Sequence, residues 1–92
     1  MEINKMLTIS TAHVSEQTAE LLDNDGIYGV IVYPKDQYGW FIVIEEDCMK
    51  DYKDDIPNEL LRLMKFTKAN NCDWLCLDCD GEIIEYLETF DW

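Results

Sequence analysis

Positive charge is scarce in this sequence of 92 residues. Seven Lys and Arg residues stand against twenty Asp and Glu residues, so the formal net charge is −13 at pH 7. Direct nucleic-acid binding relies on Lys and Arg to displace counterions from phosphates, and this composition argues against it. Anionic membrane surfaces are disfavoured for the same reason. A partner recruited by charge should be a basic protein; the alternative is that the acidity serves only solubility.

Long apolar runs are absent as well. The first ten residues, MEINKMLTIS, lack the apolar region of a signal peptide. No run approaches the roughly twenty apolar residues that a membrane span needs. We therefore expect a cytoplasmic protein without membrane contact, whose four cysteines stay reduced.

Apolar residues are nevertheless plentiful. They make up 48% of the chain, which is too much for a disordered acidic tail. The length fits a single domain that spans residues 1–92.

The local patterns predict two helices and a small sheet. Ser15 is a typical N-cap and Asn24-Asp25-Gly26 a typical helix end, and residues 57–71 carry a helical period behind Pro57. Apolar, β-branched segments predict strands at 6–10, 27–34, 38–46 and 73–79, with a charged connector at 47–55 and a returning strand at 82–87. The pair 27–34 and 38–46 is a hairpin, closed by Pro34 at the end of its first strand. Both of its strands are almost continuously apolar, which predicts burial on both faces.

These elements predict an α+β fold. Their order is β-α-β-β-α-β, the ferredoxin-like plan with helices on one face of an antiparallel sheet, followed by a C-terminal hairpin arm. Many unrelated activities use this plan, so it implies none.

The stretch NCDWLCLDCDGE places Cys72, Cys76 and Cys79 at a C-x3-C-x2-C spacing. Radical enzymes hold an iron–sulfur cluster with such a spacing on a loop, but the interleaved Trp and Leu residues are typical of a strand. Residues an odd number apart on a strand face opposite ways, so Cys76 and Cys79 should diverge. We predict buried thiols, no metal and no cofactor. The acidic turns DNDG and DCDG fail the calcium-loop pattern, because leucine, valine or cysteine would occupy ligand positions.

The only histidine, His13, lies beside Ser10 and Thr11. An imidazole and a hydroxyl can form a nucleophile–base pair, which makes a small hydrolase or transferase one hypothesis. No G-x-S-x-G elbow accompanies these residues, and the other interpretation is a junction whose side chains satisfy backbone groups.

Carboxylates concentrate in segments 45–59 and 73–91. Two negative surfaces on a rigid frame can imitate the phosphates of a duplex, although two ordinary solvated faces would have the same composition. The residues proposed for partner binding are Glu45, Glu46, Asp47, Asp51, Asp54, Asp55, Glu59, Asp78, Asp80, Glu82, Glu85 and Glu88.

Four segments together, ISTAHVSEQTAELLD, YGWFIVI, NCDWLCLDCDGE and YLETFDW, resemble a bacterial family of unknown function. Its members are small proteins often carried on plasmids and integrative conjugative elements, sometimes near antirestriction genes. The resemblance covers nearly the whole chain, least at 46–58, and it implies no catalytic residue and no role for the thiols. Glu88 stands where this family often has a proline. The motif positions are His13, Gly39, Trp40, Asp73, Trp74, Asp78, Asp80, Gly81 and Trp92.

Three hypotheses about function follow. The first is a non-enzymatic accessory protein of a mobile genetic element that binds a basic protein partner, as a DNA mimic against host defence. The second is the enzyme centred on His13. The third is a protein-assembly module that uses a strand edge or the terminal Phe90-Asp91-Trp92.

Overall fold

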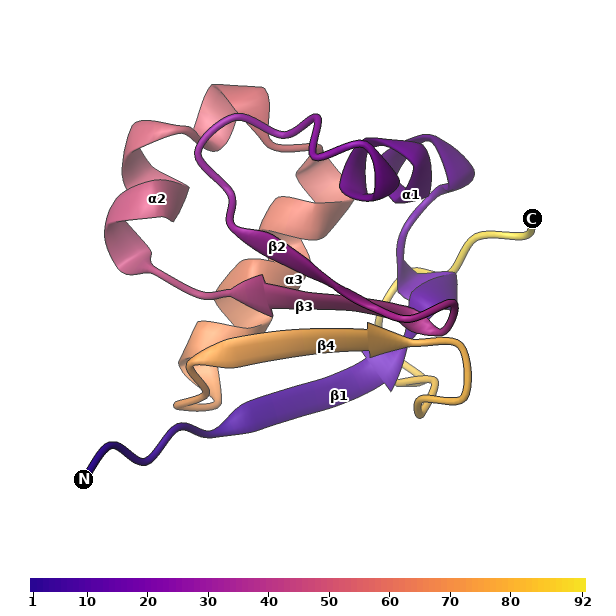
Figure 1. The fold of residues 1–92 in the computed structure, drawn as a ribbon. Helices are drawn as coiled ribbons and strands as arrows, with labels where there is room; N and C mark the ends of the chain where they lie inside the picture. Colours follow the sequence, from indigo (N-terminus) through magenta and orange to yellow (C-terminus); the bar gives the residue numbers. More distant parts are fainter.

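The computed structural model describes residues 1–92 and contains four strands, three α-helices and two short 3-10 helices. In chain order they are β1 (Met6–Ser10), η1 (Thr11–His13), α1 (Glu16–Asp23), β2 (Val32–Lys35), β3 (Gly39–Val43), α2 (Glu46–Asp51), η2 (Lys53–Asp55), α3 (Asn58–Ala69) and β4 (Trp74–Asp78) (Figure 1). The predicted α+β class is confirmed. None of the helices has the length and hydropathy that crossing a lipid bilayer requires.

The sheet is mixed, with strand order β1-β4-β3-β2. β2 pairs antiparallel with β3 and β3 with β4, whereas β1 runs parallel to β4. The prediction of a wholly antiparallel sheet is therefore wrong for one of three pairings. The reason is that all three α-helices lie between β1 and β4 in the sequence, and this long crossover returns the chain beside β1 in the same direction.

The helices begin and end largely where the sequence places them. The Ser15 side chain accepts a hydrogen bond from the Thr18 N–H (3.2 Å), which caps α1, and the helix ends before Asn24. The predicted connector at 47–55 instead contains most of α2. Cys48 and Met49 are buried in the core, and their burial stabilises a helix in this charged segment.

The first hairpin strand is shorter than predicted. Residues 27–31 lie outside β2, although the Ile31 carbonyl still accepts from the Val43 N–H (3.1 Å). Gly29 has a φ of +84° and packs against the ring of Tyr52, where a β-carbon would lie 2.4 Å from ring atoms. Only glycine fits this position without strain. Pro34 does not end the strand: it lies inside β2, opposite Trp40. Because β2 is at the edge of the sheet, the N–H that Pro34 lacks is not needed for a hydrogen bond to β3. The proline also makes this edge a poorer site for pairing with another strand.

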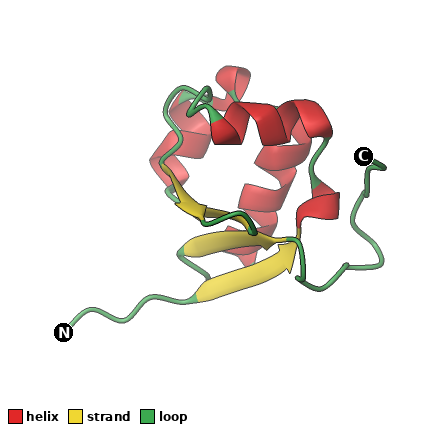
Figure 2. Ribbon diagram, turned by 45° about the vertical axis from the view of Figure 1, so that its right-hand side comes forward, coloured by secondary structure: helices red, strands yellow, loops and turns green.

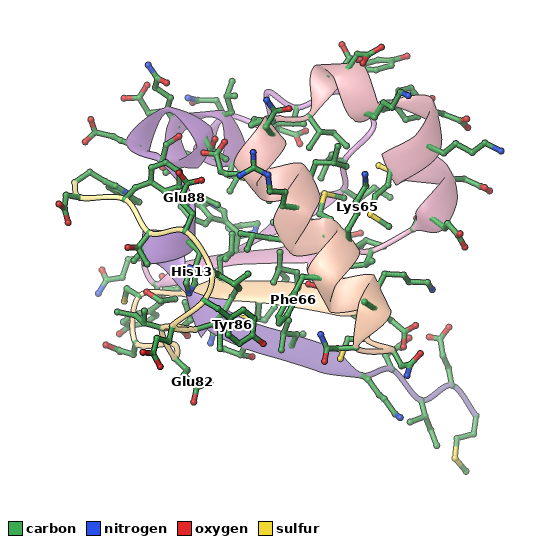
Figure 3. The ribbon with its side chains drawn as sticks, turned by 180° about the vertical axis from the view of Figure 1, so that it is seen from behind. His13, Lys65, Phe66, Glu82, Tyr86 and Glu88 are labelled. Atoms are coloured by element: carbon green, nitrogen blue, oxygen red, sulfur yellow. The ribbon has the colours of Figure 1, made fainter.

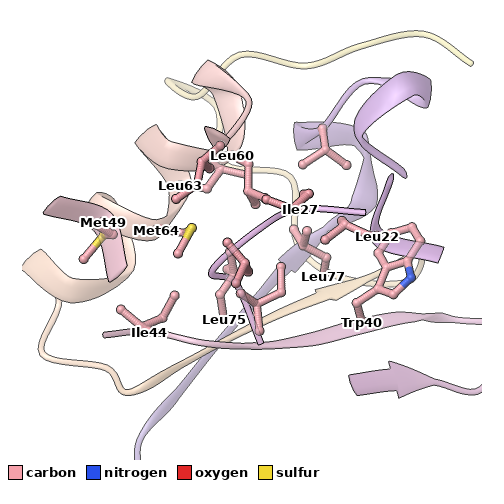
Figure 4. Close-up of a cluster of buried hydrophobic side chains, with 14 of the residues drawn as sticks. Leu22, Ile27, Trp40, Ile44, Met49, Leu60, Leu63, Met64, Leu75 and Leu77 are labelled. Carbon is pink, nitrogen blue, oxygen red and sulfur yellow. The ribbon is translucent and has the colours of Figure 1, made fainter. Parts of the chain in front are cut away.

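The core lies between one face of the sheet and the helices, which all cover that face as predicted (Figure 2). Leu60, Leu63 and Met64 of α3 meet Leu75 and Leu77 of β4 there (Figure 4). The predicted inward residues of α1 and α3 are buried. Hydrophobic burial on this one face supplies the main driving force for folding.

The opposite face of the sheet carries no helix. Strand register places Met6 beside Trp74, Val43 beside Trp74, and Tyr33 beside Phe41 on that side. Tyr33 is 52% exposed and Met6 45% exposed. The prediction that the hairpin is buried on both faces is therefore wrong. We call this surface the open sheet face, made of Met6, Thr8, Tyr33, Phe41, Val43 and Trp74; Cys76 lies on the same side of the sheet but is buried.

The C-terminal residues do not form the predicted returning strand. β4 already has β1 on one side and β3 on the other, so it has no free edge for a hairpin partner. Residues 82–92, which we call the C-terminal strap, instead run irregularly past η1. Backbone bonds join the Ser10 N–H to the Glu82 carbonyl (2.9 Å) and the Phe90 N–H to the Ala12 carbonyl (2.8 Å).

Candidate functional site

His13 is buried and ties the strap to the body of the protein (Figure 3). Its Nδ1 donates to the Glu88 carbonyl (2.8 Å), and its Nε2 accepts from the Ile84 N–H (2.9 Å). A carbonyl can only accept and an N–H can only donate, so these two partners fix the neutral imidazole with its proton on Nδ1. Both ring nitrogens are thus occupied by backbone groups.

This geometry gives no support to a nucleophile–base pair. The Ser10 hydroxyl oxygen accepts from the Ala12 N–H (3.0 Å), and neither it nor the Thr11 hydroxyl is hydrogen-bonded to the imidazole. A hollow of about 370 Å³ is lined by His13, Arg62, Tyr86 and Glu88. The Tyr86 phenol is the only hydroxyl group in this lining, and it is not hydrogen-bonded to the imidazole, whose two nitrogens bind backbone groups. His13 acts as a structural anchor.

The terminal tryptophan is attached to its own chain. The Trp92 Nε1–H donates to the Val14 carbonyl (2.8 Å), while 55% of the residue stays exposed. The Tyr86 ring meets Phe66 of α3 edge to face, with centroids 6.0 Å apart. The strap is therefore held along its length, and its terminal residues are engaged within the molecule.

The cysteines are spread along β4 and beyond it. Cys76 is buried, Cys72 is half-buried and Cys79 is exposed, so the prediction of buried thiols is right for Cys76 and Cys48 and wrong for Cys79. The one group of three potential ligands is Asp78, Cys79 and Asp80, whose ligand atoms lie within 4.8 Å of one another. Asp78 in this group already pairs with Lys35.

Eleven of the twelve predicted partner-binding carboxylates fall into two groups at opposite ends of the sheet, and the twelfth, Glu59 on α3, lines the same hollow as Glu88. One group follows Val43 into α2 and η2, and the other follows Asp78 into the strap, while Val43 and Asp78 mark the two ends of the β3–β4 ladder. Lysines of α3 lie between the two groups, as Lys65 shows in Figure 3. The carboxylates therefore do not merge into one elongated face.

Glu59 is set apart from the solvated carboxylates because it joins α3 to α1. One of its oxygens accepts from the Ser15 N–H (3.0 Å) and from the Thr18 hydroxyl (2.8 Å). Burial alone would raise the pKa of Glu59, but these hydrogen bonds outweigh it, so the pKa lies below its usual value. Glu59 serves the fold.

Asp78 is likewise engaged inside the molecule. It forms an ion pair with Lys35, which lowers the pKa of Asp78 and raises the pKa of Lys35, and it accepts a hydrogen bond from the Asp80 N–H (2.8 Å). Glu88 pairs with Arg62 at 3.4 Å on the surface. Exposed carboxylates without an ion pair remain on α2, on η2 and in the strap.

Most of the motif residues hold the fold together. Gly39 has a φ of +156° and approaches β4 so closely that a β-carbon would lie 1.7 Å from the Leu77 carbonyl oxygen. The Trp40 Nε1–H donates to Asp23 (2.9 Å), and Asp73 accepts from the Lys5 N–H (3.1 Å). Trp74 differs from these residues, because it faces outward from the sheet.

The open sheet face has an apolar hollow of about 280 Å³ at its centre. Met6, Tyr33, Phe41 and Trp74 line it, and the rings of Tyr33 and Trp74 have centroids 5.9 Å apart. The Lys35 ammonium group lies 5.7 Å from the centroid of the Phe41 ring, which is a cation–π contact on this aromatic surface. Sequence reasoning missed this surface, because the apolar residues on both faces of the hairpin indicate a second apolar face but not whether helices or solvent cover it.

The fold and its surfaces define a small α+β protein with a mixed four-stranded sheet, of which one face is covered by helices and the other is open. The chain belongs to a family of unknown function, DUF5983, whose C-terminal domain matches residues 6–92. This agrees with the membership of an uncharacterised family that the motifs predict. No curated protein and no solved structure matches the chain.

Proposed function

We propose that this protein is a non-enzymatic binding protein that docks a basic protein partner on the open sheet face. The observation that carries the proposal is the solvent-facing aromatic hollow of Tyr33, Phe41 and Trp74 on a sheet whose other face is fully packed. Contiguous apolar surface of this kind marks interaction sites, and Trp and Tyr are the residues that most often dominate binding energy.

The charge of the molecule selects the kind of partner. With a net charge of −13, the protein attracts basic surfaces over long range and repels a second copy of itself. Cationic side chains of a partner would also find the aromatic rings, in the way that Lys35 lies over Phe41. A basic protein with an apolar patch is therefore the occupant that matches both features.

The resemblance supplies a setting for this binding. A small acidic protein carried on a mobile genetic element would gain from inhibiting a host defence enzyme, whose DNA-binding cleft is basic. Imitation of a duplex draws support from the net charge, whereas the separation of the two carboxylate groups favours recognition through the open sheet face. We therefore place inhibition by docking ahead of DNA mimicry.

Two tyrosines provide a matched test. Tyr33 and Tyr28 are both exposed, and each forms one aromatic ring pair, Tyr33 with Trp74 and Tyr28 with Tyr52. Proteins that the wild type captures from a bacterial host lysate would be identified by mass spectrometry. Their affinity would then be measured for the wild type and for the variants Tyr33→Ala, Trp74→Ala and Tyr28→Ala. The proposal predicts that one captured protein is basic and that Tyr33→Ala and Trp74→Ala each weaken its binding by at least about tenfold, whereas Tyr28→Ala leaves the affinity unchanged.

A charge variant separates docking from mimicry. Neutralising the α2–η2 acids by Asp51→Asn, Asp54→Asn and Asp55→Asn should slow association and reduce its salt dependence while leaving the complex formed. If this triple variant abolishes binding and Tyr33→Ala does not weaken it, the protein is a duplex mimic and the docking proposal is wrong. Retention of the partner by all the aromatic variants would also contradict it.

The two other hypotheses rest on fewer observations than the docking proposal. Enzyme function at His13 lacks a hydroxyl group that is hydrogen-bonded to the imidazole. Assembly through a strand edge would use β1 or β2, the two edge strands, and Pro34 in β2 disfavours the second. Assembly through the terminal residues would require release of the Phe90 and Trp92 bonds to Ala12 and Val14. Size-exclusion chromatography of a variant truncated after Thr89 would show whether these residues affect the oligomeric state.

A further inference from the structure

A second concave surface lies on the helix side of the molecule, away from the open sheet face. It is a groove of about 470 Å³ between α3 and the α2–η2 segment, with the side chain of Met49 at its apolar side and Glu46 as its only carboxylate. Its other charged residues are Lys50, Lys53, Lys65 and Lys68. In Figure 3 Lys65 lies between α3 and α2.

This groove gathers four of the seven basic residues of an acidic protein. Of the other three, Lys35 is paired with Asp78 and Arg62 with Glu88, and only Lys5 stands alone. None of the four groove lysines forms an ion pair, although the chain has twenty carboxylates. Like charges on neighbouring positions, such as Lys65 and Lys68 one turn apart on α3, repel one another and destabilise the helix. An anionic ligand would remove this repulsion.

We propose that the groove binds a compact anion with several negative charges, of the polyphosphate class. The ammonium group of lysine is a common phosphate-binding group, and cations from two separate elements can contact several phosphates at once. The volume lies within the range of small-molecule sites. The site is separate from the docking surface proposed above, so either proposal can fail without the other.

The surroundings of the groove limit the size of the ligand. Glu45, Asp47 and Asp51 lie on or next to α2, and Asp54 and Asp55 lie on η2. A long nucleic acid would pass these carboxylates and meet the field of a molecule with a charge of −13, whereas a short polyphosphate would feel mainly the four lysines. The structure therefore favours a small phosphorylated ligand over a nucleic acid.

Titration with inorganic tripolyphosphate tests the proposal. Isothermal titration calorimetry at about 50 mM NaCl should show one site, with affinity that falls as salt is raised. Inorganic monophosphate should bind at least about tenfold more weakly, because it contacts fewer lysines. In ¹⁵N-labelled protein, tripolyphosphate should shift the amide signals of residues 46–53 and 65–69.

Charge-matched variants make the result specific. Lys65→Gln and Lys68→Gln should each weaken tripolyphosphate binding by about tenfold, whereas Lys5→Gln, which removes the same charge outside the groove, should leave it unchanged. Circular dichroism would show that all three variants are folded. Equal weakening by Lys5→Gln, no shift at the groove residues, or no binding by the wild type would overturn the proposal.

Discussion

Two polar side chains, Glu59 and His13, join segments that are far apart in the sequence. Glu59 links the first turn of α3 to the start of α1, and His13 links η1 to the C-terminal strap. Sequence patterns placed His13 in a possible catalytic pair and Glu59 in a partner-binding surface. The structure gives both a stabilising role, because each satisfies backbone or hydroxyl groups that would otherwise be buried without a partner.

The lowered pKa of Glu59 makes stability depend on pH. Its contribution is fully present above its ordinary pKa of 4.5 and is lost as the pH falls through the lower value of the folded state. Glu59→Gln should reduce the free energy of unfolding by about 1 kcal/mol at neutral pH, because hydrogen bonds to a charged acceptor are the stronger ones. Urea unfolding at pH 7 and at about pH 3 should show the gap between wild type and variant closing at the acid end. Glu85→Gln, an exposed residue without a partner, is the control, and an equal effect of both variants would contradict this role.

The four thiols should differ in reactivity. Burial raises the pKa of Cys48, with further contributions from the charges of Glu45 and Asp51, and the Cys48 thiol lies 2.9 Å from the Gly29 carbonyl. Because the thiolate is the reactive form, iodoacetamide at mildly alkaline pH should modify exposed Cys79 first and leave Cys48 and Cys76 unmodified until the protein unfolds. Mass spectrometry of time points, with a urea-unfolded sample as control, measures the order. Modification of Cys48 as fast as Cys79 would show that this segment is open.

At the scale of elements, local patterns predicted what depends on neighbours in the sequence. The hairpin, the N-cap at Ser15 and the buried face of α3 with Leu60, Leu63, Met64 and Thr67 all follow from spacing and capping chemistry. Helix α2 was missed because its six residues hold four charges, and only the tertiary burial of Cys48 and Met49 stabilises it.

What local patterns could not supply was the pairing of β4. Nothing in residues 73–79 indicates that β4 pairs with β1 on one side and with β3 on the other. This pairing leaves β4 without a free edge, so the strap cannot form a strand beside it. The open sheet face was missed for the same reason. An apolar strand face looks identical in the sequence whether a helix or solvent covers it, so the hairpin residues Tyr33 and Phe41 were predicted to be buried.

We expect His13 to hold the C-terminal strap in place and to stabilise the folded protein. His13→Ala removes both side-chain bonds to the strap and leaves a cavity, so we expect a loss of about 3 kcal/mol in the free energy of unfolding. The strap should also become sensitive to limited proteolysis between residues 82 and 92. Thr89→Ala changes an exposed strap residue and should have neither effect. Resistance of the His13→Ala strap to protease would show that Trp92 and the backbone bonds hold it alone.

At the scale of the whole molecule, charge and apolar surface are arranged unevenly. Most of the predicted partner-binding acids lie at the two ends of the sheet, and four of the five unpaired lysines meet in one groove on the helix side. The aromatic residues of the hollow lie on the opposite face. This division separates the proposed docking surface from the proposed small-anion site. The net charge of −13 then acts over the whole molecule to favour basic partners and to keep copies apart.

The three tryptophans give the most direct measurement of the docking claim. Trp40 is hydrogen-bonded to Asp23 in the core, Trp92 is bonded to Val14 at the strap, and Trp74 lines the hollow of the open sheet face. In ¹⁵N-labelled protein each indole N–H gives its own signal. On addition of the captured basic partner, we predict that the Trp74 indole signal shifts or broadens while those of Trp40 and Trp92 remain. A complex that leaves the Trp74 signal unchanged would contradict the account.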